Sequence, residues 1–323
     1  MRLTSFQRLA VTTTALTYLL IAVGGLVRAS GAGLGCPDWP RCFGSWIPPA
    51  SAAELPAGFD PAEFNPTLMW TEYLNRLLGV SVGFAILGTT IAAWRRHRRS
   101  PRILWPVVAA VLLTGYEGWL GGRVVAHALA PWIVTAHMVV ALVIVQLLLW
   151  ATVESLVEDA PRGSAGSTTP AAASPALTRF GWAAWAATAL LLAQVALGTQ
   201  VRGRVDDALP DVPRAEALQT VGAIDATHRD VAAVVVLAVV GLWVWARLTH
   251  PGHRALALAS HIALAAAAVQ IAAGMTLTAF ALPPPAQVVH LTTASVLLGA
   301  LTALGLIAWR WPAPPPAAAA RPA

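Results

Sequence analysis

Long apolar segments alternate with short polar ones along the whole chain. Each apolar segment has about 20 residues, which is the length that an α-helix needs to cross the hydrocarbon core of a bilayer. The pattern therefore predicts an all-α polytopic membrane protein with eight transmembrane helices. The predicted spans are 9–27, 68–94, 103–120, 131–153, 180–201, 221–245, 255–280 and 287–309.

Composition supports this class of protein. Of the 323 residues, 57% are hydrophobic and 11% are charged, which is too apolar for a soluble domain of this size. All 21 basic residues are arginine, and thirteen of them fall on one side of the predicted spans, chiefly between 95 and 102. Because cytoplasmic loops carry the excess of basic residues, this side is the cytoplasm. We expect a multi-pass protein of the cell membrane with both termini cytoplasmic, and no nucleic-acid partner.

The second and sixth spans open with the same motif, an acid followed by Asn or His at i+3 and Arg at i+4. Residues at this spacing share one face of a helix. Ionisable groups at the mouth of a membrane span are costly, so they mark a functional site. The two copies are Glu72, Asn75 and Arg76 in the second span, and Asp225, His228 and Arg229 in the sixth.

A lone histidine lies in each of two later spans. His137 follows Asn75 by 62 residues, and His290 follows His228 by the same number. The equal spacing therefore predicts an internal repeat, with one copy in each half of the chain. Four spans in each unit is an even number, so we expect two tandem four-helix bundles related by a pseudo-two-fold axis along the membrane normal.

The repeat divides the chain into an N-terminal bundle at 1–153, a cytoplasmic linker at 154–178, a C-terminal bundle at 179–310 and a disordered tail at 311–323. The linker is rich in Ser, Pro, Ala and Gly, a composition that cannot bury a core. The alignment is imperfect, because the first unit carries 21 extra residues and Gly115 falls six positions out of register with Gly274.

The chain has only two cysteines, Cys36 and Cys42, in the predicted outer loop at 30–67. An outer location is oxidising, so a short-loop disulfide is the natural interpretation. A simple loop staple, a redox-active pair and free thiols all remain open.

Three histidines fall at a similar depth, about 7 to 9 Å inside the helix mouths at about 1.5 Å per residue. They are His137, His228 and His290. Two neutral imidazoles facing each other at one depth are what axial ligation of a haem iron needs. A lone buried histidine is more often a polar group whose hydrogen bonds are satisfied within the protein. The repetition of histidines at one depth favours a role as iron ligands. His127, near the outer mouth of the first bundle, is a possible further participant.

Four arginines lie at the helix mouths, at the right level to pair with haem propionates. They are Arg28, Arg76, Arg202 and Arg229.

Together these motifs resemble the bacterial haem A synthase family over about residues 8–310. The resemblance implies an oxidoreductase that converts the C8 methyl of haem O to the formyl of haem A. It implies that the first bundle holds the substrate haem and the second a haem b cofactor. Carried over by position, Glu72 is the catalytic acid and His137 a substrate-haem ligand, while Cys36 and Cys42 match the outer cysteine pair.

The second bundle matches the family's pattern more fully. His228 and His290 are the implied haem b ligands, with Asp225 and Arg229 as groups that support them. The first bundle departs at Asn75, where many family members have His. An amide is a poor iron ligand, so Asn75 is only a possible contact to the substrate haem, and His127 could ligate the iron instead.

Two other classes of protein stay open at this stage. A di-haem electron-transfer membrane cytochrome would need two symmetric histidine sites, and a transporter without haem would leave the matched histidines unexplained. Haem O synthase and an electron acceptor are plausible membrane partners. The sequence does not indicate an oligomeric state.

Overall fold

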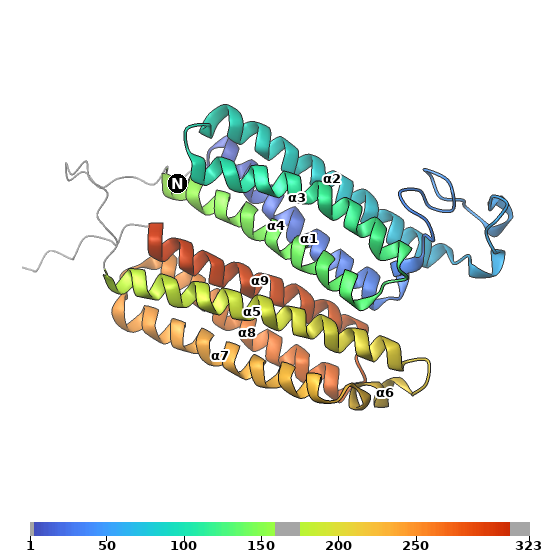
Figure 1. Cartoon of the computed structure of the whole chain (residues 1–323). Helices are drawn as coiled ribbons and strands as arrows, with labels where there is room; N and C mark the ends of the chain where they lie inside the picture. The colour runs from blue at the N-terminus through green and yellow to red at the C-terminus, as the bar shows by residue number, and fades with distance from the viewer. Residues whose placement is uncertain (1–2, 159–174, 311–323) are drawn as a thin grey trace, which may run out of the picture.

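The computed structural model describes residues 3–158 and 175–310 (Figure 1). This part of the chain is helical and has no strand, which confirms the all-α prediction. Eight of its helices are long and apolar enough to cross a membrane. They are α1 (Ser5–Ala29), α2 (Pro66–His97), α3 (Pro101–Ala126), α4 (Pro131–Glu158), α5 (Pro175–Ala208), α7 (Ala223–Thr249), α8 (Arg254–Ala279) and α9 (Pro284–Arg310). Short turns lie between them: η1 (Ala32–Leu34), η2 (Ala52–Glu54), η3 (Pro61–Glu63), α6 (Arg214–Ala217) and η4 (Leu218–Val221).

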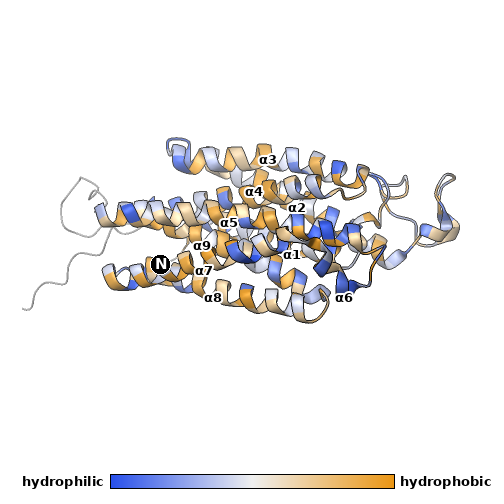
Figure 2. Ribbon diagram, turned by 60° about the horizontal axis from the view of Figure 1, so that its bottom comes forward, coloured by the Kyte–Doolittle hydropathy of each residue, from blue (hydrophilic) through white to orange (hydrophobic). Residues whose placement is uncertain are grey.

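Local signals fix where these helices begin. Five of the eight, α2, α3, α4, α5 and α9, start at a proline, whose missing N–H and fixed φ suit the first helical position. Before α1, Thr4 and Gln7 form a capping box. These starts precede the apolar runs, so most helices are longer than the predicted spans. Figure 2 shows hydrophobic residues along the middle of the helices and hydrophilic ones gathered toward their ends.

The long helices pack as two neighbouring rings. In the first, α1 contacts α2, α2 contacts α3, α3 contacts α4, and α4 contacts α1. In the second, α5, α7, α8 and α9 contact one another in the same cyclic order. The rings meet where α9 contacts α1 and α4, and where α4 contacts α5 (Figure 1). This arrangement is compatible with the predicted tandem bundles.

Helix α9 lies at the centre of the molecule. Its most apolar stretch is 72% buried, whereas those of the other seven spans are 22–39% buried. Small residues allow neighbouring helices to approach it closely. A Cβ at Gly299 would overlap the Tyr18 hydroxyl of α1, and one at Gly305 would meet the Trp185 indole of α5.

The predicted linker is shorter than its composition indicated. Residues 154–158 continue α4, and α5 already begins at Pro175. The buried Glu154 carboxylate accepts a hydrogen bond from Arg310 Nε at 3.0 Å, which ties the end of α4 to the end of α9. This ion pair is the physical reason why the helix extends past the apolar run. Residues 159–174 of the linker and the predicted tail at 311–323 lie outside the described residues.

Replacing Gly299 by Leu should destabilise the packing of α1 against α9, because the new side chain must displace Tyr18. Overpacking of this kind costs about 1 to 3 kcal/mol. The thermal unfolding midpoint in detergent should fall accordingly. Gly241→Leu is the matched control, since Gly241 is exposed on α7 with no atom within 4 Å of its Cβ position. Equal midpoints for the two variants would contradict this account of α9.

Candidate functional site

The three predicted histidines occupy equivalent places in their helices. His137 lies in the second turn of α4, His228 in that of α7 and His290 in that of α9. All three helices begin at the end of the molecule that carries α6 and the loop between α1 and α2 (Figure 1). The histidines therefore belong to one end of the two rings.

In the second ring, His228 packs against α5. The side-chain amide of Gln194 donates to the His228 carbonyl at 2.7 Å, and its Nε2 lies 3.0 Å from His228 Nδ1. One turn further along α5 is Gly198, where a Cβ would come within 3.0 Å of His228 Cε1. Only glycine leaves room for the ring here.

His290 packs against α8 in the same manner. A Cβ on Gly274 would lie 3.6 Å from His290 Cε1. His290 Nδ1 is buried without a hydrogen-bond partner in the described part of the chain. His228 and His290 lie on α7 and α9, which are opposite each other in the cyclic order of the second ring.

These features fit a haem group in the second ring. Each imidazole faces a glycine, and one ring nitrogen is a buried donor or acceptor that lacks a partner. Among the described residues there is no cluster of three or more His, Cys, Asp or Glu that could hold a metal ion alone. A metal held by a histidine pair needs its remaining ligands from elsewhere, and a porphyrin supplies four nitrogens.

The first ring repeats part of this arrangement. A Cβ on Gly121 would lie 3.5 Å from Cε1 of His137, as Gly274 lies beside His290. Gly121 precedes Gly274 by 153 positions, and His137 precedes His290 by the same number. The expected mismatch at Gly115 is therefore wrong: Gly121 is the counterpart of Gly274, and the two halves are in register here.

Asn75 is the first-ring counterpart of His228, but it makes no contact equivalent to that of His228 with its neighbouring helix. Its Oδ1 is buried without a hydrogen-bond partner among the described residues. Gly24 of α1, which the sequence aligns with Gly198, has no atom within 4 Å of its Cβ position. The shorter asparagine thus leaves space where the second ring has an imidazole.

His127 lies just after α3, outside the helices that carry the other histidines. Its Nδ1 is 3.0 Å from the Arg123 carbonyl oxygen, and its ring makes an edge contact with Trp132 at 5.8 Å between centroids. These contacts hold the ring at the end of α3.

Glu72 is one of the most buried acids, with 4% of its surface exposed. Its Oε2 accepts a hydrogen bond from the Cys36 backbone N–H at 2.8 Å, and its Oε1 accepts one from Arg76 Nε at 3.1 Å. Arg76 also donates to the carbonyls of Asp38 and Arg41, at 2.7 and 2.8 Å. The motif that opens α2 therefore anchors the outer loop.

Cys36 and Cys42 form a disulfide, as predicted, with their Cα atoms 4.8 Å apart. Both are buried, and they pack with Phe43 and Met69 in a small core of their own. Because Cys36 is also the donor to Glu72, the disulfide and the acid belong to one structural unit.

The other predicted polar residues lie at the same end. Asp206 of α5 binds Arg28 of α1, and its Oδ1 lies 2.8 Å from Arg202 Nη2, so it bridges the two rings. Arg28 and Arg202 each keep a buried Nε with no hydrogen-bond partner among the described residues.

The motif that opens α7 is more exposed than its counterpart. Asp225 pairs with Arg229, whose side chain is 56% exposed, and no cysteine loop covers them.

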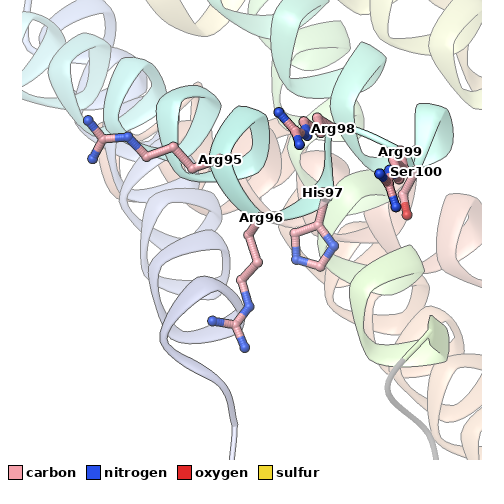
Figure 3. A pocket seen from close by; sticks show the side chains of 6 residues that line it. All are labelled: Arg95, Arg96, His97, Arg98, Arg99 and Ser100. Carbon is pink, nitrogen blue, oxygen red and sulfur yellow. The ribbon is translucent and has the colours of Figure 1, made fainter.

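A second concentration of charge lies at the opposite end of the molecule, where α2 turns into α3. A shallow hollow there is lined by Arg95, Arg96, His97, Arg98, Arg99 and Ser100. Figure 3 shows these side chains pointing in different directions rather than toward a common centre. The hollow is therefore a solvated basic turn, separate from the histidines.

Three site residues were not foreseen from the sequence: Glu117, Gln194 and Gln270. Glu117 Oε1 lies 3.0 Å from His137 Nδ1, and Gln194 contacts His228. The Gln270 Oε1 accepts a hydrogen bond from Thr293 at 3.0 Å, one turn from His290. The sequence does contain a pattern that could have identified these three residues: each lies four positions before a glycine that faces a histidine.

The fold and these residues define a multi-pass membrane protein with three histidines, each facing a glycine, at one end of its helices. A family model described as cytochrome oxidase assembly protein, COX15-CtaA, matches residues 7–302. The chain belongs to this family.

Several curated relatives carry the name heme A synthase. The chain is 29% identical to the one from Methylobacterium nodulans over 329 residues, covering 88% of this chain and 87% of that protein. It is 30% identical to the one from Methylorubrum extorquens over 203 residues, covering 58% and 51%. It is 31% identical to the Shewanella oneidensis protein over 141 residues, covering 42% of each. The matched region thus spans about half the length of the last two relatives.

Both cysteines should resist alkylation until a reductant is added, because the disulfide is formed and buried. Mass spectrometry of the alkylated protein in detergent measures this directly. Cys36→Ser should lower the free energy of unfolding by about 2 kcal/mol, the chain-entropy value for so short a loop. Full labelling of both thiols before reduction would show that the pair is not a disulfide in the resting protein.

Proposed function

We propose that this protein is a haem A synthase, which oxidises the C8 methyl of haem O to a formyl group. The observation that carries the proposal is the unequal repeat at one end of the molecule. The second ring has two histidines facing glycines, whereas the first has one such histidine, His137, and the open position at Asn75. Membership of a family whose curated relatives are named heme A synthase supports it.

In this proposal the second ring holds a haem b cofactor between His228 and His290. The cofactor, when bound, supplies a centre that accepts and passes on single electrons. Two imidazoles on opposite helices of this ring, α7 and α9, would hold such a group in place, and Gln194 supports His228 from α5. Asp225 and Arg229 lie within one turn of His228 and support the same helix.

The first ring holds the substrate haem O, with His137 as its ligand. A substrate has to enter and leave, and a single strong ligand opposite the asparagine allows both. The buried Asn75 oxygen has no hydrogen-bond partner in the described residues, so it is available for a substrate contact. His127, held by Arg123 and Trp132, is a weaker candidate for this role.

Glu72 is the proposed catalytic acid, one helical turn from Asn75. Oxidation of a methyl group releases protons and electrons; the Glu72 carboxylate, near that methyl, would accept protons as a general base, and the electron acceptor would take the electrons. The donors from Cys36 and Arg76 hold the carboxylate in one position. The same contacts make the outer loop part of the active site.

Arginines near the histidines would neutralise the haem propionates. Arg28 and Arg202 share one carboxylate, that of Asp206, and each keeps a buried donor without a partner among the described residues, so both have a donor left for a propionate. Arg76 and Arg229 are engaged by their own carboxylates, so a propionate would compete with Glu72 or Asp225 for them.

The proposed orientation places the arginine-rich turn between α2 and α3 in the cytoplasm, together with both termini. The histidines and the disulfide loop then face the outer side of the cell membrane. The proposed partners are membrane lipid, haem O synthase as the source of substrate, and an electron acceptor.

Haem A production tests the proposed function. We expect the wild-type chain, expressed in a bacterium that makes haem O but has no haem A synthase, to yield haem A on extraction and chromatography. Glu72→Gln should accumulate haem O, with haem A reduced by about 10² or more, the usual contribution of a proton-transfer group.

Glu63→Gln, an exposed acid in the same outer loop, should behave as wild type. If the wild type carries haem b alone and makes no haem A, the protein is an electron-transfer cytochrome instead. Wild-type turnover by Glu72→Gln would remove only the role of that residue.

The second-ring histidines can be tested by spectroscopy. His228→Ala and His290→Ala should each abolish the low-spin signal of the haem b site, because a six-coordinate iron needs both imidazoles. Electron paramagnetic resonance of the purified protein measures this signal. His261→Ala is the control, since this exposed histidine of α8 bonds only to the carbonyl of Ala257. An unchanged low-spin signal in both site variants would contradict the assignment.

A further inference from the structure

We propose that Glu117 is a positioning residue for His137, and that it makes the first haem site chemically different from the second. The inference rests on the proposed function, because it assumes that His137 binds the iron of the substrate haem. It concerns a residue on α3 that neither the repeated motif nor the outer loop contains.

The contact between the two side chains is close. Glu117 Oε1 lies 3.0 Å from His137 Nδ1, across the packed pair α3 and α4. His137 Nδ1 itself has no completed hydrogen bond in the described part of the chain. The Glu117 side chain is 14% exposed, and neither of its oxygens has a hydrogen-bond partner among the described residues.

A carboxylate in the interior of a membrane helix is costly unless a partner compensates it. The imidazole of His137 is the group within reach of Glu117. Hydrophobic or amide side chains would fill the same space at less cost. The acid at this position therefore indicates a role that needs a strong acceptor beside the histidine.

The second ring shows what the site is like without the acid. The residue 153 positions after Glu117 is Gln270, just as His290 is 153 positions after His137. The Gln270 oxygen accepts a hydrogen bond from Thr293, and His290 Nδ1 has no partner in the described chain. The first-ring counterpart of Thr293 is Val140, which cannot compete for the carboxylate. The first ring thus has an acid beside His137, whereas the second ring has at the equivalent position an amide that is already bonded to Thr293.

An acceptor at Nδ1 fixes the tautomer of a metal-binding histidine. The proton stays on Nδ1, so the lone pair of Nε2 is available for the iron, and the ligand becomes more basic. A more basic ligand binds oxidised iron more strongly. This suits a site that has lost its second imidazole at Asn75, because the single remaining ligand then has to hold the substrate alone.

The experiment exchanges the two partners in the full-length protein loaded with haem in detergent. Glu117→Gln gives the first ring the amide of the second, and Gln270→Glu gives the second ring the acid of the first. Tyr116→Phe, next to Glu117 on the exposed face of α3, is the control for the helix. The measurements are the midpoint potential of each haem and the iron–histidine stretch in the resonance Raman spectrum.

Glu117→Gln should raise the first-ring potential, lower its iron–histidine frequency and weaken haem binding there by about 10- to 100-fold. The second-ring signals should not change, and Gln270→Glu should shift those signals in the opposite direction. Glu117→Asp keeps the charge but shortens the side chain, so it should resemble Glu117→Gln. It also provides the test if the amide variant does not fold.

Two outcomes separate this inference from the proposed function. If the first-ring potential and frequency are the same in wild type, Glu117→Gln and Glu117→Asp, Glu117 does not position the ligand, although the haem site stands. If His137→Ala retains the first-ring haem with an unchanged spectrum, the ligand assignment fails and the inference fails with it.

Discussion

The need to compensate ionisable groups inside a membrane governs this structure. Both acids that the described chain buries, Glu72 and Glu154, pair with an arginine, and Asp206, which is less buried, pairs with two. Glu154 and Arg310 join α4 to α9, while Asp206 joins Arg28 of α1 to α5. In lipid, hydrophobic packing alone does not determine which helices associate. Polar contacts and small residues therefore determine which helix surfaces pack together. The pair of Arg28 and Asp206 lies at the end of the molecule that carries the proposed haem sites, and the pair of Glu154 and Arg310 lies at the opposite end.

Internal duplication explains how two unequal sites share one architecture. The offset of 153 positions relates Glu72 to Asp225, Asn75 to His228, and Glu117 to Gln270. The glycines that face the histidines are kept in both rings, which keeps the space for a planar group. The differences fall on the residues that touch that space. In the proposed function the second copy keeps a permanent cofactor, which leaves the first copy free to lose a ligand and gain an acid.

The sequence predicted the spans from patterns within single helices, and the histidines from a motif and a 62-residue spacing that recur in both halves. Length and hydropathy locate a span, and the spacing of three or four residues locates a shared face. Glu117 escaped prediction because its partner lies on another helix, and a single acid within an apolar run has no periodicity. The position of Arg76 escaped for a different reason: its acceptors are carbonyls of an irregular loop, whose path no local pattern specifies. The apparent mismatch in register at Gly115 arose because the sequence does not show which glycines face a histidine.

The 21 extra residues of the first half belong to the loop that carries the disulfide, and this loop is bound to Glu72. In the second half the equivalent acid, Asp225, pairs with an exposed arginine and has no such cover. Burial of Glu72 therefore follows from the insertion and not from the repeated helix motif. A short disulfide stabilises little by chain entropy, yet it limits the positions that the Cys36 N–H can take. The insertion thus places a rigid donor on the acid of the ring proposed to bind substrate, and leaves the ring proposed to bind cofactor open. Such a difference is expected where one half performs proton transfer, which needs a carboxylate held in place, and the other only transfers electrons.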